Sequence, residues 1–226
     1  MIKVSENKKT GIVPVKILLL YSFFFYAAWS VVHFFIEPFI DRYENDVLSA
    51  VVIEGICKNL IWTLPAVILI CKYKDKLYVG LKEMFTPKKT CVKYLWVYAA
   101  MAAYLVLGSL IHRGSLSIVD TFGFDDIIIV LFVGLTEELV FRGWLLNATV
   151  HIGENKALAL NAAMFLLIHF PTWIVNGEFV NAFTSFGFVC IIALSVIFGL
   201  MFLRTRNILV PITLHMLWDL LLFMGL

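Results

Sequence analysis

The sequence contains little charge and few of the patterns that mark soluble enzymes or nucleic-acid-binding proteins. Only 15% of its 226 residues are charged, and the formal net charge of +2 is too small to indicate a nucleic-acid partner. The four cysteines form no C-x-x-C pair and no metal-ligand spacing, which argues against a disulfide framework and favours small buried thiols. No internal repeat and no H-E-x-x-H motif is present. These absences leave apolar sequence as the dominant feature.

Hydrophobic residues make up 62% of the chain, and the mean hydropathy of +0.93 is typical of a polytopic membrane protein. We therefore expect one integral membrane domain over residues 1–226, built as an all-α bundle of transmembrane helices. Seven apolar segments are candidate spans: Ile17–Ile36, Val47–Cys71, Tyr94–His112, Ile127–Leu146, Ala157–Phe170, Ser185–Leu203 and Ile208–Leu226. The first is too long for a signal peptide and no small-x-small cleavage site follows it, so we expect it to be retained.

The basic residues predict how these helices are oriented. If the N-terminus and alternate loops lie in the cytoplasm, most of the 18 lysines and arginines lie inside; Arg42 and Arg113 lie outside, and Lys58 and Arg142 lie within predicted spans. This bias predicts an N-inside, C-outside topology. The longest inner loop, Lys72–Lys93, holds seven lysines and could lie on anionic lipid, although a solvated loop is the simpler interpretation.

The segment Ile127–Leu146 places two adjacent carboxylates and an arginine inside an otherwise apolar run. Ionisable groups at that depth cost at least about 2.5–3.5 kcal/mol each, so they persist mainly when they are paired or used for chemistry. Glu138 and Arg142 are four residues apart on one helical face, which predicts an ion pair. Glu137 is rotated by about 100° from Glu138 and has no basic partner on its own helix, which leaves it available as a general base.

Two later segments carry further ionisable groups at a similar depth. His169 lies on the fifth segment, and His215 lies on the seventh with Asp219 four residues later. At about 1.5 Å per residue, Glu137, His169 and His215 all fall between roughly one third and two thirds of the way across the membrane. They can therefore meet, and Asp219 can orient His215 or bind a ligand beside it. Phe165 lies one turn before His169, on the same face.

Each of these signals has a structural alternative. A lone intramembrane histidine is more often a packed, hydrogen-bonded residue than a catalytic one, and a Glu–Arg pair can serve only as a lock. Glu54 and Lys58, four residues apart in the second segment, are interpreted as a structural ion pair. The convergence of three polar segments at one depth, in a chain with few intramembrane charges, favours a functional site.

Three ordered motifs carry these residues: Glu137-Glu138-x-x-x-Arg142, Phe165-x-x-x-His169 and His215-x-x-x-Asp219. They resemble the motifs of the CAAX protease and bacteriocin-processing family, also called the Abi family, whose eukaryotic members include the type II CAAX prenyl endopeptidases. The resemblance covers about residues 127–219. One such motif is weak evidence, but three in this order and at this spacing are specific.

The resemblance implies a glutamate-dependent intramembrane endopeptidase. In such enzymes Glu137 would activate water with help from His169, while His215 and the residue at position 219 would stabilise the oxyanion. The chain departs here from the eukaryotic pattern, because Asp219 stands where asparagine is found and an ionised aspartate cannot donate a hydrogen bond. Asp219 must then be protonated, orient His215 or serve another role.

The remaining motif residues complete the predicted site. We place Glu138 among the catalytic residues and give Arg142 and Phe165 structural or orienting roles. Residues 127–226 then form the expected catalytic core in the last four helices, and residues 1–126 form three accessory helices.

A metal site is the alternative to metal-free catalysis. Two histidines with Glu137 and Asp219 would suit zinc or another divalent ion, with a bound water as nucleophile. Each of the expected ligand helices contributes through one isolated position, however, and no zinc motif is present. We therefore predict a site that uses no metal and no other cofactor.

The substrate is left open by the resemblance. The expected partners are a membrane-associated peptide or protein substrate and membrane lipid, and bacteriocin or pheromone precursors and CAAX-like proteins are candidate substrates. The alternative function is a non-proteolytic membrane immunity or scaffold protein that binds a partner through the same fold. A proton-coupled transporter is disfavoured by the small size and the lack of a repeat. In each case we expect a multi-pass protein of the bacterial cell membrane.

Overall fold

The computed structural model describes residues 11–226, whose regular secondary structure is entirely helical and includes no strand. Within these residues the all-α prediction is confirmed. The α-helices are α1 (Val15–Val31), α2 (Glu37–Ile40), α3 (Asp46–Ala50), α4 (Leu64–Lys72), α5 (Leu81–Phe85), α6 (Leu95–Arg113), α7 (Phe124–Glu138), α8 (Asn147–Thr149), α9 (Glu154–Leu167), α10 (His169–Val175), α11 (Phe179–Thr184), α12 (Gly187–Thr205) and α13 (Leu209–Phe223).

Several of these helices continue into wider or tighter turns. The π-helical segments are η1 (Val32–Ile36), η3 (Val51–Cys57), η4 (Asn59–Thr63) and η7 (Leu139–Leu146). The 3₁₀ segments are η2 (Asp41–Tyr43), η5 (Lys74–Lys76), η6 (Lys89–Tyr94) and η8 (Val150–Ile152). Because π-helical turns occur frequently at functional sites, the start of η7 directly after Glu138 favours a site on this helix.

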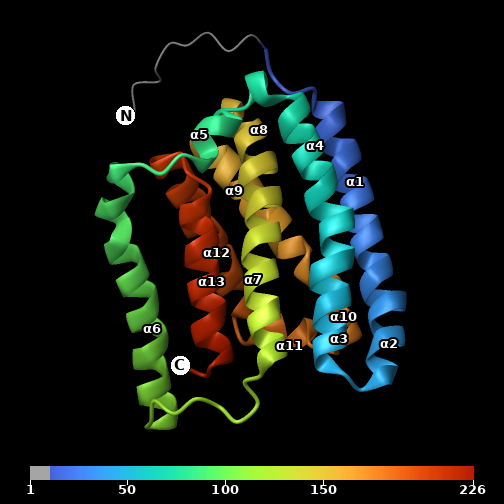
Figure 1. Cartoon of the computed structure of the whole chain (residues 1–226), viewed down its shortest axis with the longest axis vertical. Helices are drawn as coiled ribbons and strands as arrows, with labels where there is room; N and C mark the ends of the chain where they lie inside the picture. The colour runs from blue at the N-terminus through green and yellow to red at the C-terminus, as the bar shows by residue number, and fades with distance from the viewer. Residues whose placement is uncertain (1–10) are drawn as a thin grey trace.

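Each of the seven segments expected to span the membrane is helical, and Figure 1 shows these helices running alongside one another. Five described helices are long and apolar enough to cross a membrane: Val15–Tyr43, Asp46–Lys72, Lys89–Arg113, Glu154–Val175 and Gly187–Thr205. Helix α7 with η7 instead carries three charges in its apolar part, and α13 is shorter. The count of seven spans and the N-inside orientation therefore stay predictions. The basic residues Lys3, Lys8 and Lys9, which support that orientation, lie outside the described residues.

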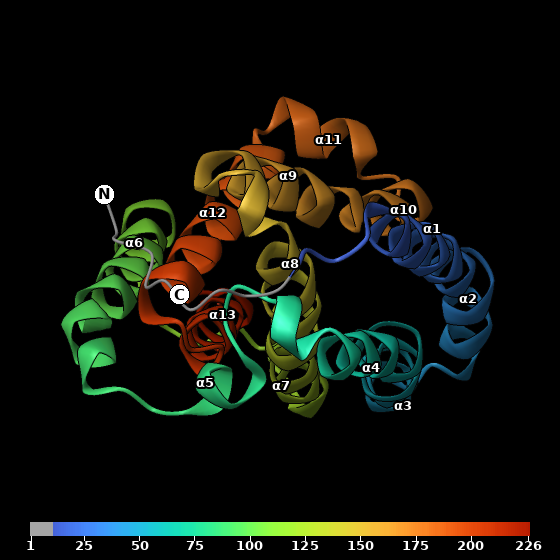
Figure 2. The same ribbon diagram turned by 90° about the horizontal axis from the view of Figure 1, so that it is seen from above.

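Helix α7 lies between two groups of helices, as seen from above in Figure 2. On one side it packs against α13, which in turn contacts α6 and α12. On the other side it packs against α3, η3 and η4, while η7 packs against α4. The second of the three expected accessory helices, residues 46–72, therefore contacts the helix that carries both predicted catalytic carboxylates.

The close approach of α7 and α13 depends on Gly134. A Cβ atom added at this glycine would lie 2.5 Å from Cγ of Met216 and 3.3 Å from the carbonyl oxygen of Ile212, both on α13. These separations are shorter than ordinary van der Waals contact, and one of them involves backbone that cannot move freely. The glycine lets α13 approach α7 one turn before Glu138.

Replacing Gly134 by alanine should therefore separate α7 from α13 and destabilise the protein. Overpacking typically costs about 1–3 kcal/mol, which exceeds the roughly 1 kcal/mol of helix propensity that alanine gains over glycine. Gly108→Ala on α6 is the matched control, because nothing lies within 4 Å of an added Cβ there. Thermal unfolding in detergent should show a loss for Gly134→Ala alone, and equal melts for the two variants would contradict the close packing.

The loop Lys72–Lys93 is an ordered cap, so its interpretation as a simple solvated loop was wrong. Leu77, Val79 and Met84 are fully buried. The Val79 backbone N–H donates to Oδ1 of Asn147 at 2.6 Å, and the Asn147 side-chain amide donates back to the Val79 carbonyl at 3.0 Å. The lysines are exposed or half-buried, while Leu77, Val79 and Met84 between them pack into the core at the end of the bundle, where Figure 1 places α5 near α8.

An ion-pair cluster fastens the same cap to the turn between α12 and α13. Glu83 accepts hydrogen bonds from Nε of Arg206 at 2.7 Å and Nη2 at 2.9 Å, and from Lys88 Nζ at 2.8 Å. The Arg206 guanidinium, followed by Lys88, holds the pKa of Glu83 at about 2. Arg206 has a φ of 53°, in the left-handed region that non-glycine residues rarely adopt. These contacts hold the turn that begins α13 in place.

The cysteines differ from the prediction of buried thiols. Cys71 and Cys190 are exposed on the outside of the bundle, Cys57 and Cys91 are half-buried, and all four are free. An apolar segment identifies a helix but does not say which of its faces points inward, and Cys71 and Cys190 lie on outward faces.

Candidate active site

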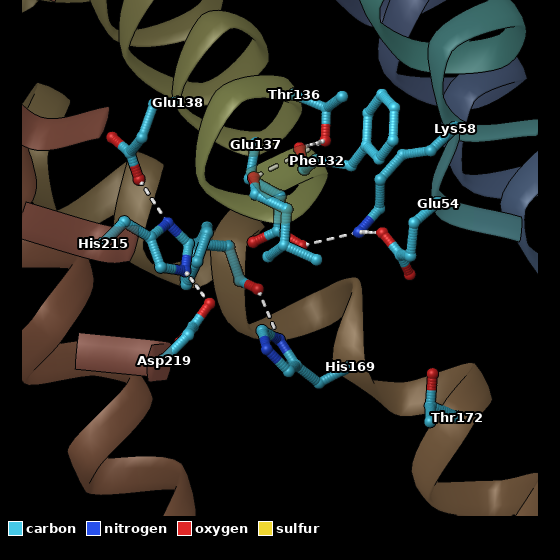
Figure 3. A network of polar contacts seen from close by, with 12 residues as sticks. Glu54, Lys58, Phe132, Thr136, Glu137, Glu138, His169, Thr172, His215 and Asp219 are labelled. Carbon is cyan, nitrogen blue, oxygen red and sulfur yellow. Dashed lines mark hydrogen bonds and ion pairs between the residues drawn. The ribbon is translucent and has the colours of Figure 1, made fainter. Parts of the chain in front are cut away.

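The residues of the three motifs gather in one buried cluster between α7, α10 and α13 (Figure 3). Glu137 is 6% exposed and His215 is 6% exposed, and Glu138 is completely buried. His169 and Asp219 are half-buried. The structure therefore brings together all five residues that the sequence analysis placed in the catalytic set.

The predicted ion pair between Glu138 and Arg142 is present. Nη1 of Arg142 donates to Oε1 of Glu138 at 2.9 Å, and both side chains are 0% exposed. The other terminal nitrogen, Nη2, donates to the backbone carbonyl of Ser195 at 3.0 Å and to its hydroxyl at 2.8 Å. Since Ser195 belongs to α12, the arginine connects the end of α7 to α12.

His215 is held from two sides by carboxylates. Its Nδ1 lies 2.9 Å from Oε1 of Glu138, and its Nε2 lies 3.4 Å from Oδ2 of Asp219. The ring also stacks on Phe198, with centroids 4.9 Å apart. Asp219 thus lies where it can orient His215, which is one of the roles left open by the sequence. With both ring nitrogens on carboxylates, His215 presents no unoccupied nitrogen to a metal ion.

His169 begins a new helix at a break in the chain. Helix α9 ends at Leu167 and α10 starts at His169, and Pro171 has no N–H for the carbonyl of Leu167, which explains the break. Nδ1 of His169 donates to the carbonyl of Phe165 at 3.0 Å. In a neutral ring this leaves Nε2 as the hydrogen-bond acceptor. Figure 3 shows the imidazole close to Glu137.

Phe165 contacts both imidazoles. Its ring centroid lies 5.4 Å from that of His169 and 6.0 Å from that of His215. The guanidinium carbon of Arg142 also lies over the ring, 4.6 Å from its centroid. The aromatic ring therefore fills the space between three site residues from α10, α13 and η7, in keeping with the orienting position predicted for it.

A residue that the sequence analysis placed outside the site contacts Glu137 directly. Nζ of Lys58 donates to Oε1 of Glu137 at 3.0 Å and lies 2.5 Å from Oε2 of Glu54. The interpretation of Glu54 and Lys58 as only a structural pair was therefore incomplete. The i, i+4 spacing of two charges in an apolar segment was the available signal, but it could not show which helix packs against them.

The first helix contributes a second contact. Nε2 of His33 lies 2.9 Å from the hydroxyl of Thr172, three residues after His169 on α10. His33 is buried and contacts the carboxylate of Glu37 through its other ring nitrogen. The helices expected to be accessory thus touch both α7 and α10 beside the site.

Residues 11–226 contain no group of three or more His, Cys, Asp or Glu side chains placed to hold a metal ion. The four side chains considered as zinc ligands are instead occupied with one another or with neighbours: His215 with Glu138 and Asp219, Glu137 with Lys58, and His169 with the Phe165 carbonyl. This donor set does not fit a tetrahedral zinc site without rearrangement.

Comparison with known proteins supports the resemblance seen in the motifs. Residues 120–221 match the family model described as type II CAAX prenyl endopeptidase Rce1-like. No curated protein and no solved structure matches the chain. The match contains all of the motif residues and supports a relationship between this part of the chain and the CAAX protease family. Lys58 and His33 lie outside the matched residues.

Proposed function

We propose that the protein is an intramembrane endopeptidase in which Glu137 acts as the general base. The observation that carries the proposal is the convergence of Glu137, His169 and His215 in one buried cluster, from three separate helices. A carboxylate and imidazoles that gather in one buried cluster are a common arrangement for activating water. The membrane location follows from the five apolar helices and the matching family.

In the proposed reaction a water molecule lies between Glu137 and His169. Glu137 takes a proton from the water as the water oxygen attacks the carbonyl carbon of the scissile peptide bond. Nε2 of His169 accepts a hydrogen bond from the same water. Nε2 of His215, whose contact with Asp219 is long at 3.4 Å, leaves that carboxylate and donates a hydrogen bond to the oxyanion of the tetrahedral intermediate. Collapse of the intermediate breaks the C–N bond, and the proton held by Glu137 passes to the leaving nitrogen.

The other residues of the site hold these groups in place. Glu138 and Asp219 orient His215 from its two nitrogens, and Arg142 compensates the charge of Glu138. Phe165 keeps the two imidazoles apart. Positioning of this kind matters because small errors in the placement of a reacting group lower rates strongly.

The substrate and the cellular setting are part of the same proposal. We propose a membrane-associated peptide or protein as the substrate, with bacteriocin or pheromone precursors and CAAX-like proteins as candidates, and the bacterial cell membrane as the location. The competing function is a non-proteolytic immunity or scaffold protein. The intact set of Glu137, His169 and His215 favours the protease, because binding a partner does not require acid–base groups at this depth.

Cleavage of a peptide library tests this proposal. The purified protein in lipid bilayers would be incubated with a proteome-derived peptide library, one half unmodified and one half farnesylated on a C-terminal cysteine, and new termini would be identified by mass spectrometry. Bonds cut by the wild type but not by Glu137→Ala would support the protease and show whether prenylation matters. Absence of any such bond in both halves would favour the scaffold.

A metal-free reaction makes a separate prediction at Asp219. Because an asparagine at position 219 could still contact His215 and can donate a hydrogen bond to the oxyanion, Asp219→Asn should retain activity. Chelators should not inhibit, and the purified protein should carry less than one equivalent of zinc by elemental analysis. Stoichiometric zinc, inactivation by chelation and recovery on adding zinc would instead establish a metal enzyme at the same site.

A further inference from the structure

The ammonium group of Lys58 is shared by two carboxylates from different helices. It lies 2.5 Å from Glu54, one turn earlier on its own helix, and 3.0 Å from Glu137 on α7. The side chain of Lys58 is only 3% exposed, and those of Glu54 and Glu137 are 15% and 8% exposed. Figure 3 shows the Glu137 carboxylate with Lys58 on one side and the imidazoles on the other. Ionisable groups this deeply buried are retained when each has a partner.

Packing as well as charge determines where Lys58 lies. Its ammonium lies 4.7 Å from the ring centroid of Trp62 and 5.3 Å from that of Trp29, so two indole faces enclose it. Lys58 stands between the π-helical segments η3 and η4, which both pack against α7. The helix that carries it lies outside the family match at residues 120–221.

We propose that Lys58 is a positioning residue for Glu137 and that Glu54 limits how tightly Lys58 holds it. This inference rests on the proposed general-base role of Glu137. An opposite charge within about 4–6 Å favours the ionised form of a carboxylate, so Lys58 keeps Glu137 able to accept a proton and fixes one of its oxygens. The second oxygen then remains free for water. The accessory helices are on this basis part of the catalytic machinery.

Glu54 provides Lys58 with a partner for the moment when Glu137 becomes neutral. Before proton transfer the three groups carry one positive and two negative charges. After Glu137 takes up the proton from water, Glu54 and Lys58 remain as a neutral pair. No unpaired charge is left in the interior, which lowers the cost of the protonated intermediate.

Other charged and titratable groups also face Glu137. These are His169 from α10, His215 and Asp219 from α13, the adjacent Glu138, and Arg142 from η7. All five stay unchanged in variants that alter only positions 54 and 58. Differences among those variants therefore result from Lys58 and Glu54.

The first measurement does not depend on catalysis. Infrared spectra of the full-length protein in bilayers would follow the carbonyl stretch of a protonated carboxyl group against pH, assigned to Glu137 by its loss in Glu137→Gln. In the Glu54→Gln/Lys58→Met double variant the band should appear about 1–3 pH units higher than in the wild type, because the ammonium is gone. In Glu54→Gln the band should appear at lower pH than in the wild type, because the Lys58 ammonium then has Glu137 as its one carboxylate partner.

The second measurement uses the peptide cleaved in the library assay. The acidic limb of the pH–rate profile should move to higher pH in the double variant and to lower pH in Glu54→Gln, as the infrared band does. At neutral pH the double variant should lose about 10- to 100-fold in kcat and recover part of it at higher pH, as expected when a base is lost by protonation. Glu83→Gln is the matched control: it removes a carboxylate shared by two cations in the cap, away from the site, and should leave the acidic limb where it is.

The double variant also separates positioning from structure. It replaces a buried ion pair by a neutral pair of similar length, a change that is often tolerated in protein interiors, and a thermal melt checks that the protein is folded. If Lys58 only stabilises the fold, a folded double variant should show the wild-type infrared titration and pH profile, and that result would overturn the inference. Shifts in the infrared titration without any cleavage would keep the inference about Glu137 and reject the proposed protease.

Discussion

Replacing Glu137 by glutamine should lower the cleavage rate by about 10²–10⁴-fold while the protein stays folded. This is the usual contribution of a general base, and the amide cannot take a proton from water. The shape of the side chain is kept, and its carbonyl oxygen can still accept the hydrogen bond from Lys58 Nζ, which spans 3.0 Å in the wild type. The measurement is kcat at neutral pH on a peptide identified in the library, together with a thermal melt in the same detergent.

Glu138→Gln is the matched control, because it makes the same chemical change one residue later. Glu138 accepts hydrogen bonds from Arg142 and His215, so its neutralisation should lower stability and not only activity. Activity of Glu137→Gln above about one tenth of the wild type would exclude Glu137 as the base, since general-base catalysis contributes at least about 10²-fold.

Replacing Arg142 by alanine should cause the largest loss of stability of any single change in the site. Removing one partner of a buried ion pair costs about 3–5 kcal/mol, because the remaining charge stays buried. Glu138 would keep only His215, and the carbonyl and hydroxyl of Ser195 would lose their donor. At about 2–4 °C per kcal/mol for a chain of this size, the melting temperature should fall on the order of 10 °C.

Arg204→Ala on α12 is the control for this effect. Arg204 pairs with Glu154 at 2.6 Å, but both side chains are 35% exposed, and exposed pairs contribute about 0–1 kcal/mol. The two arginine variants should therefore differ clearly in thermal unfolding. If Arg142→Ala has the melting temperature of the wild type, the guanidinium does not hold α7 against α12 and α13. Glu138 must then be stabilised by other contacts.

Much of the architecture could be predicted from the sequence because helices in membranes have a simple signature. Runs of about 20 apolar residues predict helices, and all seven predicted segments are helical. The boundaries were less accurate: the fifth helix extends to Val175, with a break at Ile168 that Pro171 explains only once the helix is seen. The loop Lys72–Lys93 was misinterpreted because Leu77 and Val79 are isolated among lysines, and only the packing of the loop beside Asn147 makes them buried.

The contacts of the site also fall into those that the sequence predicted and one that it did not. Glu138 and Arg142 could be paired from the sequence since their contact lies within one helix, where four residues make one turn. The gathering of His169 and His215 around Glu137 was predicted from depth, which the rise per residue determines. The contact between Lys58 and Glu137 joins positions 79 residues apart, and no local rule connects them.

The sequence by itself therefore determined the helices, the position of each ionisable group along its helix and the contacts made within one turn. Only the tertiary structure decided which helix faces which: Gly134 admits α13 against α7, and the packing of η3 and η4 on the other side of α7 delivers Lys58 to Glu137. The physical reason is the range of the interactions. Periodicity and hydropathy act along one helix, whereas the partner of a buried charge depends on the angle at which whole helices pack, and that angle results from many side-chain contacts at once.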